Sequence, residues 1–491
     1  MLPLWIIGLA TAISAVSGYN FLKVKYIIGH DAYFHYYISN LILKNGLHLP
    51  VIVTNYWEGV KYGYPPLLHI SAAIVSSLTS FDLVDVYRLF PVIALGLLVW
   101  LVYRYLQTEA PRYAFSATVI FVLIGFSIVA IYQGEYARVL GLVFSLMTLT
   151  QLNWYLDHKR MLNLALAVLF LTLAITSNLV TALFMVAFLS YLQIWHYHRD
   201  RSLIVLKILL AGLVLSGFWW ARGVYFYGVD YFINVLLSHN KTFYSLVVGS
   251  LATILTAIYA WRAKKLPSTF WMWTILSVFL VTVEYASIPI AFYTGRLVFN
   301  RLNGWPRKSW VAFHLALSIL AVTVFANLTS GRTVYHDSFV NPDVIAAGEW
   351  VRLNTDPDVS IMAYLEASFV PSDTFSTWSF MRVSLNTRDV SLPALTDRQV
   401  YTWMGYEWDT HPEQIQIYHE FQQRLCADHL IATARKYSIS PDLIWVNKDT
   451  KQYQEKIDFC DDLDRPVFTP IYENDRVLIY EVDWDSVATN R

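Results

Sequence analysis

The stretch "LPLWIIGLATAISAVSGYNFL" at residues 2–22 contains no charged side chain over 21 residues. A helix needs about 20 predominantly apolar residues to cross a bilayer, so this stretch predicts a membrane span. It lacks a basic region at its start and a small-residue cleavage site at its end, which favours a retained span over a signal peptide. The stretch therefore indicates a protein that is held in the membrane.

Composition supports the same class of protein. The chain has 491 residues, of which 56% are hydrophobic and 15% are charged. Soluble domains carry roughly 25% charged residues, so a long chain with so few predicts a polytopic α-helical membrane protein. The formal net charge is zero, and no nucleic acid partner is expected.

The number and direction of the spans follow from apolar runs and basic clusters. Apolar runs of spanning or near-spanning length begin near residues 3, 88, 113, 137, 161, 179, 203, 243, 268, 286 and 308. Lys and Arg cluster between alternate pairs of runs, which predicts cytosolic loops at 103–112, 157–160, 196–201, 261–265 and 301–308. About eleven spans in a cell or plasma membrane place the amino terminus inside, and residues 23–87 and 327–491 outside.

Two segments limit this span count. "PPLLHISAAIVSSL" at residues 65–78 has about 14 residues, too few for a span, and fits a re-entrant or interfacial helix. Residues 268–302 could instead form one long tilted helix. In that case the C-terminal domain would lie on the other side of the membrane.

The composition changes after residue 330. Helical patterns at 343–354 and 412–437 are mixed with strand patterns at 360–366 and 442–448, and 466–472 with 476–482 read as a hairpin. We therefore expect a transmembrane domain at 1–330 and a soluble extracytosolic α/β domain at 331–491. The chain's two cysteines, Cys426 and Cys460, lie in this second domain, and a disulfide is possible if it is outside the cytosol.

The first predicted outer loop opens with "GHDAYFHYYISNLILKNGLHLP" at residues 29–50. On a helix, Asp31, His35 and Ser39 would share one face, while Phe34 and Ile38 would line another. This pattern predicts an amphipathic helix on the outer surface that presents an acid and an imidazole. The alternative is that Asp31 only caps the start of the helix.

The rest of this loop, "NYWEGVKYGYPPLLH" at residues 55–69, interleaves aromatic and charged side chains. Aromatic rings can stack on the apolar faces of sugars, and acids can accept hydrogen bonds from sugar hydroxyls. A binding surface for a sugar or a lipid headgroup is therefore expected, and an interfacial aromatic belt is the alternative. The candidate binding residues are Glu58, Tyr62, Tyr64 and His69.

Further charged candidates come from the other predicted outer segments. The short loop "YQGEYARVLG" at residues 132–141 contains Glu135, a candidate for a metal or the acceptor, and Arg138, a candidate for a phosphate. A local ion pair between these two residues is the alternative. Arg296 lies inside an apolar run, where a charge is expected to face a cavity or an anion. Arg222 and Glu284 complete this set.

The order of these features resembles the GT-C superfamily of membrane glycosyltransferases, in particular its oligosaccharyltransferase-like branch. The motifs that carry the resemblance are "GHDAYFHYY", "YPPLLH" at 64–69 and "GEYAR" at 134–138. It implies that Asp31 acts as a catalytic base or a metal-associated acid, and that Glu135 helps to hold a divalent metal such as Mg²⁺ or Mn²⁺.

The resemblance also implies a sugar donor linked to polyprenyl phosphate or pyrophosphate, reached from the surrounding membrane lipids, and a glycan, lipid or protein acceptor. The oligosaccharyltransferase signature "WWDYG" is absent, and "YTWMGYEWDTH" at 401–411 does not replace it, so peptide N-glycosylation is not expected. A membrane transporter, or a subunit of a polysaccharide export complex, is the non-enzymatic alternative. The C-terminal domain is expected to bind the acceptor or to be structural.

Overall fold

The computed structural model describes residues 2–23, 26–27, 29–54, 60–125, 130–131, 134–200, 202–229, 272–276, 283–302, 306–329, 342–364, 388–401, 417, 420–421, 424–448, 458–459 and 467–489. The chain divides into two compact units. We call Met1–Ile28 with Gly63–His336 the helical unit, and Gly29–Tyr62 with Asp337–Arg491 the mixed unit. Much of the predicted first outer loop thus shares a unit with the C-terminal part of the chain.

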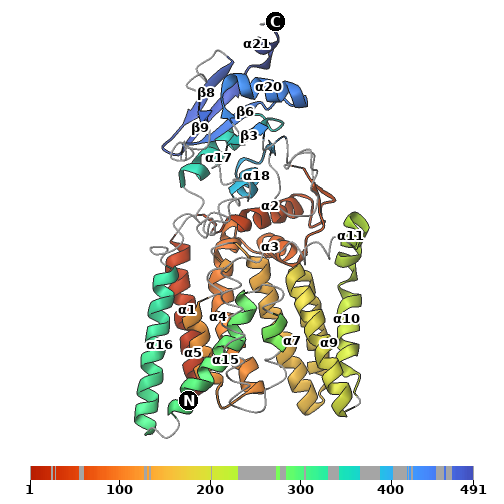
Figure 1. Cartoon of the computed structure of the whole chain (residues 1–491), viewed down its shortest axis with the longest axis vertical. Helices are drawn as coiled ribbons and strands as arrows, with labels where there is room; N and C mark the ends of the chain where they lie inside the picture. The colour runs from red at the N-terminus through yellow and green to blue at the C-terminus, as the bar shows by residue number, and fades with distance from the viewer. Residues whose placement is uncertain are drawn as a thin grey trace. The chain divides into compact units, whose positions relative to one another are not determined.

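Long apolar helices lie side by side in the helical unit (Figure 1). Four described helices are long and apolar enough to cross a membrane, and a fifth candidate span is a pair bent by 63°. This part of the chain is therefore a membrane-spanning helical fold. The described helices are α1 (Leu2–Leu22), α3 (Leu67–Leu78), α4 (Leu83–Glu109), α5 (Ala114–Ile124), α7 (Tyr136–His158), α8 (Met161–Ser177), α9 (Leu179–Asp200), the bent pair α10 (Ile204–Leu215) and α11 (Gly217–Tyr227), α15 (Val283–Leu302) and α16 (Arg307–Thr329).

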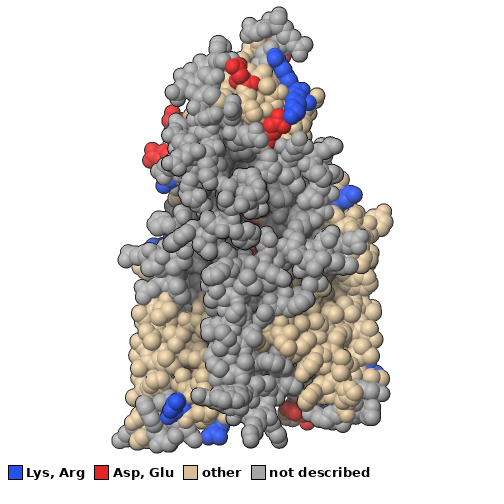
Figure 2. All heavy atoms as spheres, viewed as in Figure 1, with Lys and Arg blue, Asp and Glu red and all other residues tan. Residues whose placement is uncertain are grey.

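The sides of the helical unit expose apolar side chains. Leu4, Ile93 and Val214 are each more than half exposed. In Figure 2 the described surface along this unit is mostly free of Lys, Arg, Asp and Glu, which gather toward its ends. A wide apolar band of this kind is favourable only in contact with lipid or another apolar surface.

The count of about eleven spans stays a prediction. The run near residue 243 lies outside the described residues, and only 272–276 of the run near 268 are described. α3 forms within the stretch for which a short helix was expected, and its 12 residues are fewer than a span needs. Its depth in the membrane stays a prediction.

α4 and α7 run parallel, which defines two ends of the helical unit. Near the start of both helices, the ring of Tyr136 stacks on that of Phe90 at a centroid distance of 5.0 Å. Near the other end of both, the Asn153 amide donates to a Glu109 carboxylate oxygen over 2.7 Å. With a rise of ~1.5 Å per residue, the helix from Phe90 to Glu109 is ~28 Å long, about the thickness of the hydrocarbon core. We call these ends the Tyr136 end and the Tyr113 end, since Tyr113 follows α4 by four residues.

The mixed unit contains a five-stranded sheet with the strand order β4-β3-β6-β9-β8. β3 is parallel to both of its neighbours, whereas β9 is antiparallel to β6 and β8. The predicted hairpin forms as β8 and β9, and the two earlier strand patterns form β3 and β6. The strands are β3 (Ser360–Tyr364), β4 (Gln399–Tyr401), β6 (Leu443–Asn447), β8 (Phe468–Glu473) and β9 (Val477–Val482).

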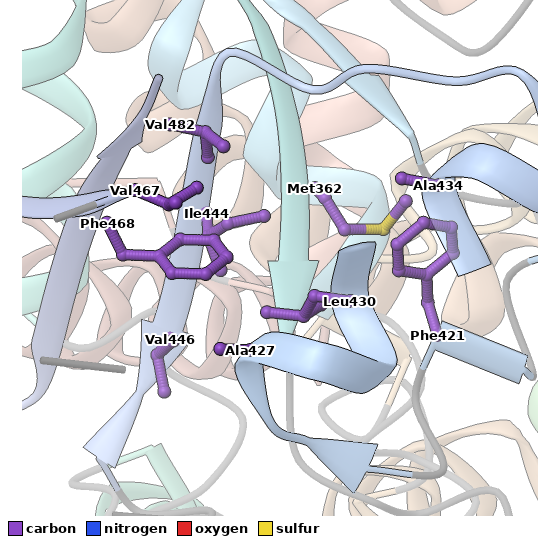
Figure 3. Packing of buried hydrophobic residues seen from close by; sticks show 10 residues of the cluster. All are labelled: Met362, Phe421, Ala427, Leu430, Ala434, Ile444, Val446, Val467, Phe468 and Val482. Carbon is purple, nitrogen blue, oxygen red and sulfur yellow. The ribbon is translucent and has the colours of Figure 1, made fainter. Parts of the chain in front are cut away.

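Helices cover both faces of this sheet. On one face, Met362 and Ile444 pack with Leu430 and Ala434 of α20 (Ala427–Tyr437), as Figure 3 shows. The other face is covered by α17 (Pro342–Asn354) and α18 (Arg388–Thr396). Side chains alternate between faces along a strand, so neighbouring β3 residues enter different cores. The second core contains Ala347, Val351, Ile361, Ala363, Leu392, Val400, Leu443, Trp445, Val477 and Ile479.

One secondary-structure prediction was wrong. The helical pattern at 412–437 is interrupted by β5 (Arg424–Leu425), which pairs in parallel with β7 (Asp458–Phe459), and α20 begins only at Ala427. The pairing of distant segments overrides local periodicity here. Cys426 follows β5 directly and is disulfide-bonded. The chain's other cysteine, Cys460, lies outside the described residues.

The amino-terminal part of the mixed unit contributes α2 (His30–Lys44) and a short hairpin of β1 (Ile52–Val53) and β2 (Val60–Lys61). α2 packs against α18 of the same unit. The helix that carries Asp31 is therefore folded together with the C-terminal sheet.

Candidate functional site

Asp31 lies in the first turn of α2. Gly29 occupies the N-cap position with φ 88°, and no side chain caps the helix. The alternative that Asp31 is the N-cap is therefore wrong. Its side chain is only 8% exposed, so the carboxylate is held away from bulk solvent.

The face that Asp31 shares with His35 and Ser39 is buried, which corrects the prediction of a surface helix that presents this face. His35 is 3% exposed and Ser39 is fully buried, and Phe34 on the apolar face is buried as well. The Ser39 hydroxyl donates to the His35 carbonyl oxygen over 2.9 Å. Burial lowers the pKa of the His35 imidazole to about 3, so this side chain is neutral at physiological pH.

Glu135 and Arg138 form an ion pair at the start of α7. The distance from Arg138 Nη2 to Glu135 Oε1 is 2.8 Å, and the two side chains are 14% and 20% exposed respectively. Glu135 is the N-cap residue of α7, and Gly134 makes the preceding turn with φ 85°. The local pair that the sequence left as an alternative is thus confirmed. It holds a guanidinium partly buried at the Tyr136 end.

A buried polar cluster joins the "YPPLLH" motif to the break between α8 and α9. The Asn178 amide donates to the Tyr64 hydroxyl over 3.3 Å, and the rings of Tyr64 and His69 lie 5.5 Å apart. Asn178 Oδ1 accepts the backbone N–H of Val180 over 2.9 Å and so caps α9. The sequence indicated a polar break at 175–182 but did not single out Asn178.

This cluster lies at the Tyr136 end of the helical unit. A Cβ placed on Gly141, five residues after Tyr136, would lie 2.3 Å from the Thr181 hydroxyl, so the start of α9 touches the start of α7. We call Tyr64, His69, Glu135, Arg138 and Asn178 the polar end.

α11 reaches the same place through Gly63. The Trp219 indole donates to the Gly63 carbonyl oxygen over 3.0 Å, and the Tyr227 ring leaves no room for a Cβ on Gly63. Arg222 lies between these two contacts on α11, with its guanidinium carbon 5.1 Å from the centroid of the Phe226 ring. The structure thus brings Arg222 to the polar end.

Arg296 lies elsewhere. Its guanidinium carbon is 5.2 Å from the centroid of the Tyr113 ring, and the preceding Gly295 packs against the Ala117 backbone of α5. Arg296 is therefore at the Tyr113 end, separated from Arg138 by most of the length of α4. The prediction that placed Arg296 together with Arg138 among the outer charged residues is corrected. The basic cluster at 301–308, five residues beyond Arg296, was the sequence signal for this depth.

The remaining candidates are less completely described. Tyr62 is buried in the mixed unit, where its backbone N–H donates to the Val51 carbonyl oxygen over 2.9 Å. Glu58 lies outside the described residues, as does the side chain of Glu284 in α15. No group of three or more His, Cys, Asp or Glu within the described parts of the chain could hold a metal ion.

No protein-family model and no curated protein matches the chain. Among solved structures, the oligosaccharyltransferase of Archaeoglobus fulgidus in its apo form matches 92% of this chain and 70% of its own, with 12% identity and a TM-score of 0.58. The mycobacterial arabinofuranosyltransferase AftD matches with 15% identity and a TM-score of 0.58, but this chain covers only 41% of it.

ArnT from Cupriavidus metallidurans, bound to undecaprenyl phosphate, matches over 97% of both chains with 13% identity and a TM-score of 0.54. All three matched proteins are GT-C glycosyltransferases. The chain therefore has a GT-C-like fold. At these identities the likeness concerns the fold.

Proposed function

We propose that this protein is a membrane glycosyltransferase that moves a sugar from a polyprenyl-phosphate-type lipid to an extracytosolic glycan, lipid or protein. The observation that carries the proposal is the likeness of fold over 97% of both chains to ArnT bound to undecaprenyl phosphate. The partly buried charges of Glu135 and Arg138 at the polar end add independent support, because ionisable side chains withdrawn from water in a membrane domain are costly and often mark a functional site.

The lipid phosphate binds at the polar end. Arg138 offers a guanidinium whose charge is already partly balanced by Glu135 over 2.8 Å, and Arg222 offers a second. A guanidinium can hold phosphate oxygens through two parallel hydrogen bonds. Tyr64 and His69, fixed against each other, supply rings for the apolar face of the sugar.

Asp31 acts as the base. Its carboxylate accepts the proton of an acceptor hydroxyl as the hydroxyl oxygen forms a bond with the anomeric carbon. The bond from that carbon to the phosphate oxygen breaks at the same time, and the phosphate leaves on its polyprenyl chain. A single displacement inverts the anomeric configuration. His35, neutral because it is buried, orients the carboxylate and adds no charge.

The chain leaves the helical unit shortly after Leu22 and re-enters it at Gly63, both at the Tyr136 end of that unit. Residues 23–28 lead from α1 into the mixed unit, and the Arg88 guanidinium, beside Tyr87 at the Tyr136 end, donates to the Leu22 carbonyl oxygen over 2.6 Å. The chain returns at Gly63, which Trp219 holds at the same end. With eleven spans, this end faces away from the cytosol.

A divalent metal shared by Asp31 and Glu135 stays a prediction. The Glu135 carboxylate is paired with Arg138, and the described residues offer no cluster of acids and histidines around it. The displacement above needs no metal, since the arginines can balance the charge of the leaving phosphate.

The breaks between helices give little support to the alternative that the protein is a transporter or a subunit of an export complex. Transporters often break helices at the bilayer midplane, around a central site. The α8–α9 break at Asn178 lies at the Tyr136 end, and α11, beyond the bend from α10, contacts Gly63 at that same end. Among the described helices, these interruptions therefore open onto the surface that we assign to transfer.

The test compares Asp31→Asn with Asp428→Asn, which makes the same change at an exposed position of the mixed unit. Membranes containing each variant are given a radiolabelled polyprenyl-phosphate sugar and an extract of acceptors. We expect Asp31→Asn to lose transfer while it still binds polyprenyl phosphate, and Asp428→Asn to keep both. Undiminished sugar transfer by Asp31→Asn would refute the proposal that Asp31 is the catalytic base.

A further inference from the structure

α18 occupies a distinct place within the mixed unit. One side of this helix packs against α2, and its carboxyl end contributes Asp397, whose Oδ2 lies 2.9 Å from the ammonium nitrogen of Lys44 in the last turn of α2. α2 is the helix that carries Asp31. α18 is thus the part of the C-terminal chain that holds the helix of the proposed base.

The other side of α18 is fixed rigidly to the sheet. Leu392 is buried in the core shared by α17 and the sheet, and a Cβ on Gly348 of α17 would lie 2.7 Å from Leu395 Cβ. At the end of α18, the guanidinium of Arg398 donates to the carbonyl oxygens of Arg352 and Thr355 over 3.0 and 2.7 Å. Arg398 is 5% exposed, so these charged hydrogen bonds are shielded from water.

From this chain of contacts we infer that α18 is a positioning element for α2, through which the C-terminal domain sets the placement of Asp31 without touching substrate. The inference rests on the proposed function, because it gives α18 a role in transfer only if Asp31 is the base. It assigns the C-terminal domain a use that requires no active site of its own.

The Lys44–Asp397 pair is the contact best suited to a test. The two side chains are 52% and 33% exposed, so the pair can be changed with little effect on the core. Exposed ion pairs contribute modestly, and losing one corresponds to about a two- to fivefold shift in a local opening equilibrium. Reversing one charge also adds repulsion, which enlarges the shift.

The experiment measures hydrogen exchange of α2 amides and steady-state transfer in the full-length protein. We expect Asp397→Lys to speed hydrogen exchange in α2 by about two- to fivefold or more. We also expect it to lower kcat, with little change in the KM for the lipid donor. The double variant Lys44→Asp with Asp397→Lys should restore both. Asp397→Asn, which removes the charge without reversing it, should show a smaller effect and guards against misfolding of the reversal.

The matched control is Glu473→Lys, which reverses another exposed ion pair of the same unit, with Lys448. Exchange in α2 that is no faster in Asp397→Lys than in this control would overturn the inference. Faster exchange with unchanged kcat would overturn it too, because the contact between α18 and α2 would then have no effect on catalysis. If the wild-type protein transfers no sugar, the proposed function fails by itself, and faster exchange would then report only a structural contact.

Discussion

Asn178 offers the sharpest test of how the polar end is built. Its side chain makes two kinds of contact at once: Oδ1 accepts from Val180 and Thr181 at the start of α9, and Nδ2 donates to the Tyr64 hydroxyl. Asn178→Ala removes both. Asn178→Ser can still cap the helix through its hydroxyl, but it is too short to reach Tyr64.

The structure sets the size of each loss. A helix cap of this type is worth about 1 kcal/mol, and a hydrogen bond between neutral side chains about 0.5–1.5 kcal/mol. Asn178 is only 6% exposed, so water cannot readily replace either partner. We therefore expect Asn178→Ala to lower the free energy of unfolding by about 1.5–2.5 kcal/mol, and Asn178→Ser by about 0.5–1.5 kcal/mol.

The assay is equilibrium unfolding of the purified protein in mixed micelles with increasing SDS, followed by tryptophan fluorescence. Sugar transfer is measured in parallel at a denaturant-free point. We expect Asn178→Ser to lose more activity than its small loss of stability explains, because Tyr64 is released from its place. Equal stability of the serine and alanine variants would refute the division of the Asn178 contribution into a helix cap and a hydrogen bond to Tyr64.

Two further predictions follow from the site. Arg138→Gln should lower the rate of sugar transfer at least about tenfold, because a charged hydrogen bond to the phosphate is lost. Arg296→Gln, at the Tyr113 end, should keep a rate within about twofold of wild type. Similar losses for the two variants in initial-rate assays would contradict the conclusion that the two arginines lie at different ends. The pKa of His35 is about 3 in the folded protein and near 6.5 in the unfolded chain. Between pH 3 and pH 6.5 the unfolded chain therefore binds more protons than the folded protein, so the folded state becomes less stable as the pH falls. We expect hydrogen exchange to report a loss of about 1.6 kcal/mol in the mixed unit between pH 6.5 and 5, and His35→Gln to flatten this dependence.

Elements with strong local periodicity could be predicted from the sequence. The β8–β9 hairpin could be predicted because two alternating segments flank a short polar turn. The apolar helices could be predicted because a long uncharged run has few other stable forms in a membrane. β5 could not be predicted in this way. It has only two residues, and its existence depends on β7, more than 30 residues away.

The candidate site shows the same division between local and distant information. The Glu135–Arg138 pair was foreseeable because its partners are three residues apart on one helix. The tether from Asn178 to Tyr64 joins residues 114 positions apart, and no pattern in the sequence signals it. Arg296 was misplaced because its apolar surroundings were given more weight than the basic cluster at 301–308, which lies only five residues beyond it.

The mixed unit is discontinuous, and this has a consequence for biosynthesis. Its first segment ends at Tyr62, but its second begins only at Asp337. At ~5–20 residues per second, the ribosome needs about 14–55 s to make the roughly 270 residues between them. During that interval α2 has emerged without α18 or the sheet to receive it. A polypeptide that stops before α18 therefore cannot dock the helix of Asp31, and this docking becomes possible only after α18 and the sheet have been made.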